Sequence, residues 1–270
     1  MGLFKKAIDR AVSDKATQKR RKRMIVFIAI ITLLSMVSST VAWFTVNTFA
    51  GVDTLDVHIS VSAQLKVSME DHGTDLNQYV KIITNEMIDG YLGSKYNTKL
   101  ADIKLDPVTT TNGTTLTNRR GTTREPNKNS YLEFECYFIA TEEMWVHLTT
   151  EHSDLEGDNG TSVTSSSPSP QSEVVQCTRV GFTTESNGTA TYEPNKAGAV
   201  TSLSTFDISD PMNYSDSSRL FHLDEMSPKK VTIRLWIEGE DPQCDDDVQD
   251  ADLKVALSFV GTDDQNVPIS

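Results

Sequence analysis

The sequence predicts an all-β protein, a two-sheet antiparallel sandwich of jelly-roll type with one short helix, preceded by an N-terminal membrane-spanning or signal helix. The clearest observation is residues 55–69, where apolar and polar side chains alternate without a break. That period of two is typical of a strand that buries one face. Similar alternation recurs in later segments at irregular spacing, which favours two packed sheets. The third observation is residues 24–44, which contain no charged side chain.

The uncharged stretch at residues 24–44 predicts a helix that can cross a membrane. Its 21 residues would form a helix about 31 Å long, which matches the thickness of a bilayer core. A basic block that ends in four consecutive cations at 20–23 precedes it. Because such blocks stay in the cytoplasm, we expect a basic cytoplasmic leader at 1–23, a signal or transmembrane helix at 24–44 and an extracellular β-sandwich domain at 45–270.

The end of the apolar stretch has the small residues that a signal peptidase needs. Thr40 and Ala42 predict a cut between Ala42 and Trp43. An uncleaved membrane anchor is the alternative, because the leader is long for a signal peptide and the apolar run is long enough to stay in the membrane. In either case the rest of the chain is exported, to the extracellular space or the cell surface.

The exported part is strongly acidic. The whole chain has a net charge of −13, and residues 1–23 contribute nine Lys or Arg and two Asp, a net charge of +7, which leaves −20 for the remainder. Such a surface repels phosphates and favours cations or basic partners. Nucleic acid binding is therefore excluded.

The remaining elements follow from the same periodicities. Residues 55–69 exceed the usual strand length, so we expect a bend or bulge near 62–64 that lets the strand serve two parts of a sheet. Residues 84–91 have apolar side chains at helical spacing and predict the one short helix. The other expected elements are strands at 131–140 with its partner at 144–150, at 175–183, and an antiparallel pair at 231–237 and 253–260. Residues 106–130 are expected to form a long loop or a hairpin with ragged edges, and residues 162–172 an exposed loop.

No catalytic motif is present. The five histidines lack metalloprotease spacing, and no nucleophile elbow, P-loop or dinucleotide fingerprint occurs. The paired carboxylates of a glycosidase are defined by their distance in the folded protein, so no sequence spacing identifies or excludes them. We predict that the protein is not an enzyme, with His58 and His147 on outward, solvated strand faces. Trp145 and Trp236 fall opposite the core faces of their strands, where each either marks a ligand surface or lies under a loop.

The segment 238–252 contains eight acidic residues among fifteen. Crowded carboxylates repel one another unless a cation lies between them, and their hard oxygen atoms suit calcium. The alternative is a solvated acidic loop, and no other cofactor is expected. The predicted calcium ligands are Glu240, Asp241, Asp245, Asp246 and Asp247.

The three cysteines lie far apart in sequence, in none of the paired spacings used for zinc or redox chemistry. An exported protein can pair two of them. We expect Cys177 and Cys244 near loops or outward faces, and a disulfide between them is the predicted pairing, while Cys136 falls on a core face. The alternative is three free thiols.

The residues around the predicted cut resemble a known leader type. The segment 39–45, STVAWFT, resembles the T-x-A-[YW]-F-[ST] ending of the TasA and camelysin group, which Gram-positive bacteria export with a dedicated signal peptidase. The segments SYLEFECYFIA, RVGFTT, TYEPN and VTIRLWIEGEDPQC resemble exported Firmicutes proteins with the same leader. Together the similar segments cover about a third of the chain.

This resemblance implies a jelly-roll subunit of an extracellular fibre or cell-surface coat. In such a subunit, the N-terminal strand freed by cleavage completes the sheet of a neighbour. Here that donor strand would be residues 43–52, beginning with Trp43, Phe44 and Val46. The expected partners are then further copies of the chain or other cell-surface proteins, besides the signal peptidase.

Two functions stay open on the sequence. The first is a structural protein of the cell surface or extracellular matrix that assembles by strand addition. The second is a module anchored in the membrane by residues 24–44 that binds a carbohydrate or protein ligand outside the cell. The fate of the bond between Ala42 and Trp43 discriminates between them.

Overall fold

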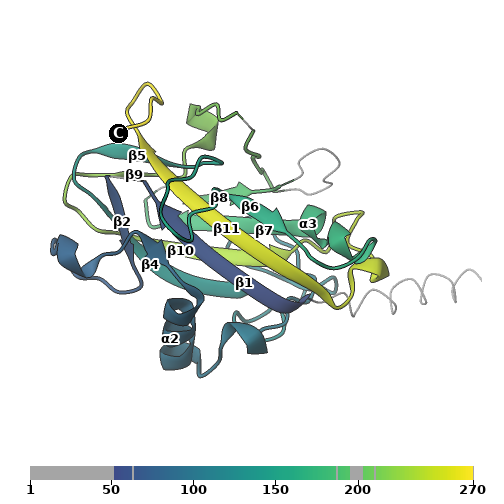
Figure 1. The fold of residues 1–270 in the computed structure, drawn as a ribbon. Coiled ribbons are helices and arrows are strands. Elements are labelled where there is room, and N and C mark those ends of the chain that lie inside the picture. Colours follow the sequence, from purple (N-terminus) through teal and green to yellow (C-terminus); the bar gives the residue numbers. More distant parts are fainter. Residues whose placement is uncertain (1–51, 63, 187, 195–202, 210, 270) are drawn as a thin grey trace, which may run out of the picture. The chain divides into compact units, whose positions relative to one another are not determined.

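Strands dominate the part of the chain that the structure describes, and they form two sheets (Figure 1). The computed structural model describes residues 52–62, 64–186, 188–194, 203–209 and 211–269. The chain divides into two units, Met1–Thr48 and Phe49–Ser270, and the described residues all belong to the second.

The first sheet has six strands and the second has five. In spatial order, the first sheet contains β3 (Ile82–Ile83), β1 (Val52–Val61), β11 (Ala251–Thr262), β5 (Met144–Leu148) and β9 (Phe221–Leu223), with β6 (Ser162–Thr164) also paired to β11. The second sheet contains β2 (Leu65–Ser68), β4 (Leu132–Ala140), β10 (Lys229–Ile237), β7 (Thr178–Thr184) and β8 (Gly188–Tyr192).

Two short α-helices accompany the sheets. The predicted helix is α2 (Asn85–Tyr96), which runs further than expected and buries Ile88 and Leu92. The second, α3 (Val174–Cys177), occupies a place where a strand was predicted, because Val174 and Cys177 are buried at a helical spacing and alternation starts only at Thr178. Single 3-10 turns occur at η1 (Leu76–Gln78), η2 (Leu100–Asp102), η3 (Gln171–Glu173), η4 (Asp216–Ser218) and η5 (Asp246–Val248).

Aromatic rings from both sheets meet in the core. The Phe259 ring on β11 lies 5.0 Å from that of Phe138 on β4 and 5.7 Å from that of Phe182 on β7. All three side chains are fully buried. Their burial and edge-on contacts hold the inner faces of the sheets together, as the alternating sequence pattern predicts.

The expectation of purely antiparallel sheets is wrong for one central pair. β1 and β11 run parallel, in one register from Thr54 beside Asp252 to Val61 beside Phe259, with a register shift between Thr54 and Val52, which lies beside Ala251. A parallel pair needs a long crossover connection, and here nearly the whole domain lies between the two strands. The other strand pairs in the described sheets are antiparallel.

Most connections between successive strands cross from one sheet to the other, and this overturns three expectations. The stretch 55–69 does break near Ser62, but its parts, β1 and β2, lie in different sheets. β4 and β5 were expected to pair, as were β10 and β11, yet each pair divides between the sheets. The alternation of apolar and polar residues predicts which side chains of a strand are buried. It does not predict which sheet the strand joins, because the same side chains would be buried in either sheet.

The predicted signal or membrane helix at 24–44 lies outside the described residues. Within the described ranges, no helix is both long enough and apolar enough to cross a bilayer.

The outer face of the second sheet is covered. Trp236 on β10 is fully buried against Val108, Leu116 and Tyr131, which belong to the segment 106–131. The expectation of a tryptophan under a loop is confirmed there. Trp145 on β5 is half-buried, with its indole N–H donating to Asp264 at 3.1 Å.

The expectation that His147 is solvated is wrong. Its side chain on β5 has no exposed surface, because the segment before β9 covers that face of the sheet. Its Nδ1 lies 3.1 Å from the hydroxyl of Ser218, and its ring lies edge-on to Tyr214 at 5.5 Å. His58, by contrast, is half-buried on β1.

Burial of His147 predicts a loss of stability in mild acid. Burial, with a smaller effect of nearby Arg219, lowers the pKa of His147 from 6.5 to about 4. The unfolded chain therefore takes up this proton first as the pH falls below 6.5, and the free energy of unfolding should decrease between pH 6.5 and 4 by up to about 3 kcal/mol. Urea unfolding across this range measures the loss.

The variant His147→Gln is the matched comparison, because an amide can bond Ser218 without titrating. Its free energy of unfolding should depend less on pH than that of the unchanged protein over the same range. Equal pH dependence in the two proteins would show that His147 contributes nothing to acid sensitivity.

Candidate functional site

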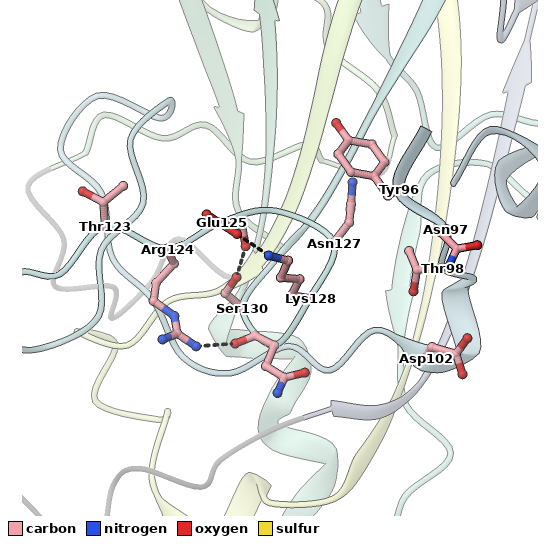
Figure 2. Close-up of a pocket in the computed structure, with 11 residues that line it drawn as sticks. Tyr96, Asn97, Thr98, Asp102, Thr123, Arg124, Glu125, Asn127, Lys128 and Ser130 are labelled. Carbon is pink, nitrogen blue, oxygen red and sulfur yellow. Dashed lines mark hydrogen bonds and ion pairs between the residues drawn. The ribbon is translucent and has the colours of Figure 1, made fainter. Parts of the chain in front are cut away.

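A polar groove of about 690 Å³ opens between the C-terminal end of α2 and the loop before β4 (Figure 2). Pockets of this size hold small organic ligands. One wall comes from the end of α2 and from η2, and the other from residues 123–130 (Figure 2). The lining residues are Tyr96, Asn97, Thr98, Asp102, Thr123, Arg124, Glu125, Asn127, Lys128, Asn129 and Ser130.

Two asparagines in left-handed backbone conformations shape the walls. Asn97 ends α2 with φ 53°, and its backbone N–H donates to the carbonyl of Leu92. Asn127 has φ 60° and is buried. Its side chain bonds both the N–H and the carbonyl of Glu133 at 2.7 Å. Asparagine tolerates this conformation better than most residues, so the local sequence suits both bends.

Further bonds fix the loop wall. The Ser130 hydroxyl donates to the carbonyl of Glu125 at 2.5 Å, and the Arg124 guanidinium donates to the carbonyl of Asn129 at 2.9 Å. Both contacts are visible in Figure 2. The loop is therefore held by its own polar groups before any ligand arrives.

The charged side chains of the groove compensate one another. Lys128 donates a hydrogen bond to Glu125, which lowers the pKa of that carboxyl. Arg124 lies 3.7 Å from Asp106, just outside the lining. With Asp102 on the facing wall, the lining carries two cations and two anions. The groove is close to neutral in a strongly acidic chain.

The predicted calcium ligand Asp241 has a protein cation instead. Its Oδ2 accepts a hydrogen bond at 2.6 Å from Nη2 of Arg179, and Oε1 of Glu193 lies 2.8 Å from the same nitrogen in ion-pair contact. All three side chains are at most 1% exposed. Arg179 therefore supplies the positive charge that crowded carboxylates need at this position.

The other predicted calcium ligands lie at the surface. Glu240, Asp245, Asp246 and Asp247 are all exposed, and Asp245 caps η5 by accepting the N–H of Asp247 at 2.9 Å. Nothing in these contacts brings the five carboxylates to one point. Calcium binding by this segment stays a prediction.

A different group of potential metal ligands lies near β9. Single ligand atoms of Glu143, His222 and Asp224 lie within 4.8 Å of one another. The His222 ring lies 3.2 Å from Glu143 and 3.5 Å from Asp224. Sequence analysis missed this group, because the turn after β4 and the end of β9 are far apart in the chain.

The two cysteines predicted to pair are neighbours, although both are buried rather than near the surface. The structure records free thiols, with a hydrogen bond between the side chains of Cys177 and Cys244. This bond, with burial, raises the pKa of the Cys177 thiol. Cys136 lies elsewhere, with its sulfur 3.7 Å from that of Met69. The pairing itself stays a prediction.

The cleavage residues Ala42 and Trp43 and the donor-strand residues Trp43, Phe44 and Val46 lie outside the described residues. The nearest described position is Val52, the first residue of β1.

Replacing the buried cation should destabilise the domain. Arg179→Met leaves Asp241 and Glu193 buried without a counter-charge, and such losses cost about 3–5 kcal/mol of unfolding free energy. Lys128→Met is the control, because the pair of Lys128 with Glu125 is exposed and should be worth less than about 1 kcal/mol. Urea unfolding of the two variants compares them, and equal losses would contradict a structural role for Arg179.

Oxidation should join Cys177 to Cys244. Refolding in a mixture of oxidised and reduced glutathione, followed by peptide mass spectrometry, should show this one cross-link with Cys136 left free. Closing a loop of this length raises the unfolding free energy by about 4 kcal/mol. Cys244→Ser should abolish both effects, and three free thiols in the unchanged protein after this treatment would refute the pairing.

No protein-family model, curated protein or solved structure matches this chain. What the groove and the strand edges can bind therefore follows from their own residues.

Proposed function

We propose that this protein is an exported structural subunit of the cell surface or extracellular matrix, which assembles into a fibre or coat by adding its N-terminal strand to a neighbouring sheet. The leader at 1–44, the acidic exported part and the resemblance to the TasA and camelysin group support the proposal. The observation that carries it is the register of β1.

β1 enters its sheet at the point where β11 begins. Val52 lies beside Ala251, the first residue of β11. The residues before Ala251 form η5 and a turn in which Asp250 has φ 56°. Residues before Val52 would therefore have no part of β11 beside them with which to form further parallel hydrogen bonds. This supports a role for residues 43–51 outside their own sheet.

The other edge of β1 pairs with β3 at Ile59 and Ser60 and is capped before that by Asn85, the first residue of α2. The Asn85 side-chain carbonyl accepts the backbone N–H of Val57 at 3.0 Å, and its amide donates to Asp56. Edge strands are commonly protected in this way against unwanted pairing. The same contacts obstruct folding of the N-terminal segment back along this part of β1.

A jelly-roll arrangement fits the connections between the sheets. Successive strands such as β4 and β5 lie in different sheets, as jelly-roll chains do. The parallel pairing of β1 with β11 distinguishes this domain from a purely antiparallel jelly roll.

The second candidate function is a membrane-anchored extracellular binding module. The preformed groove beside α2 is the observation that favours it, because a fibre subunit needs no such site. The N-terminus of the protein from its native host separates the two: a start at Trp43 indicates a released subunit, and an intact leader indicates a tethered module.

Strand addition predicts that one residue controls assembly. The chain recovered from its host should begin at Trp43 and form large assemblies in light scattering. Val46→Pro, made in the full-length chain, should be exported and cut at the same bond but remain monomeric, because proline cannot donate a ladder hydrogen bond and is poorly tolerated inside a sheet.

The control is Val46→Ile, which keeps the backbone donor and the strand preference and should assemble normally. A proline variant that assembles as fully as the isoleucine variant would refute strand addition through residue 46.

A further inference from the structure

We propose that the groove between the end of α2 and residues 123–130 binds a neutral carbohydrate chain. The proposal goes beyond assembly by strand addition, because it concerns a different part of the molecule. It follows from three properties of the groove: its lining, its charge and its rigidity.

The lining is polar and rich in groups that both donate and accept hydrogen bonds. On the wall beside α2, the side chains of Asn97, Thr98 and Asp102 make no hydrogen bond or ion pair with other described residues, and Figure 2 draws them together on that side. Asn129 belongs to the facing wall. Amide, hydroxyl and carboxylate groups match the alternating donors and acceptors of sugar hydroxyls.

An aromatic ring lies at one end of the groove. Tyr96 is half-buried, with its ring 6.3 Å from that of Tyr91 and with Nζ of Lys95 5.7 Å from its centre. These contacts fix the ring, and burial raises the pKa of its hydroxyl, so the side chain stays neutral. A fixed aromatic face can pack against the C–H groups of a sugar ring.

The charges that line the groove cancel, which argues against an anionic or a cationic ligand. Two cations and two anions line the groove, whereas the chain beyond residue 23 carries a net charge of −20. A site for an anion would need an excess of cations, and the acidic surroundings already oppose one. A site for a cation would need more carboxylates than the cations beside them. A neutral ligand with many hydroxyl groups fits both conditions.

The walls are held before binding. The side-chain bonds of Asn127 to Glu133 and the bond from Ser130 to Glu125 fix the loop. Less conformational entropy is lost when a ligand binds to groups that are already ordered. The free polar side chains of the groove can therefore contribute to affinity.

The test is calorimetric titration of the exported protein with cellohexaose, maltohexaose and chitohexaose, with an oligogalacturonate as the charged comparison. At least one neutral oligosaccharide should bind with a Kd of about 1 mM or tighter, and its affinity should change little between low and high salt. Binding of the charged oligosaccharide alone, or of none of the four, would overturn the proposal.

Variants locate the site. Asn97→Gly keeps the left-handed backbone while removing the amide, and Asp102→Ala removes an exposed carboxylate, so both should fold. Each should weaken binding about tenfold, the loss of one good polar contact. Trp145→Ala alters a half-buried aromatic side chain outside the groove and should leave the affinity unchanged. Loss of binding in Trp145→Ala, with normal binding in the two groove variants, would place the sugar elsewhere and refute this site.

The outcome is separable from that of strand addition. The Val46→Pro chain should bind the sugar as tightly as the unchanged protein, because no groove residue lies near position 46 in sequence. An assembling protein that binds no neutral sugar would refute the groove proposal alone, and a sugar-binding protein that never assembles would refute strand addition alone.

Discussion

The parallel pairing of β1 with β11 is the constraint on which the described domain depends. It joins the first described strand to the last, in one register from Thr54 to Val61, and β3, β6 and β5 attach to one or other of the two. Nearly the whole domain lies in the loop that this pairing closes. The conformational entropy lost on closing that loop must be offset by burial of the apolar side chains of the strands within it. The same pairing fixes where the described chain enters the first sheet, at Val52 beside Ala251.

The transition from β1 to β2 ties the two sheets together. The Lys81 ammonium donates to the carbonyls of both Ser62 and Leu65, at 2.7 and 2.6 Å, across the point where the chain changes sheets. Burial lowers the pKa of Lys81 to about 8. The stretch 55–69 alternates continuously in sequence, yet it is split into β1 and β2 at the carbonyls that Lys81 bonds. The apolar side chains of both strands still pack into one core.

The outer faces of the sheets are where most of the distinctive chemistry lies. The segment 106–131 covers Trp236 and continues into one wall of the groove. Arg179 neutralises Asp241 of the acidic segment 238–252. One carboxylate of this segment therefore forms a buried ion pair and is not part of a solvated loop. The acidic side chains that remain at the surface give like-charged copies of the chain a mutual repulsion at low salt.

The sequence alone determined most strands with a buried face, the helix α2 and the acidic character of the chain beyond residue 23, because alternation, helical spacing and charge are local properties. It also predicted a disulfide between Cys177 and Cys244, which are buried free thiols in the structure, so the expected exposure was wrong and the pairing stays a prediction. Only the tertiary structure decided which sheet each strand joins. The alternation in β4, for example, predicts which of its side chains are buried, and these would be the same in either sheet. It alone buried His147 and Asp241, through segments remote in sequence. The groove, too, emerged only there, because its two walls meet through the packing of α2 and not through any spacing of residues.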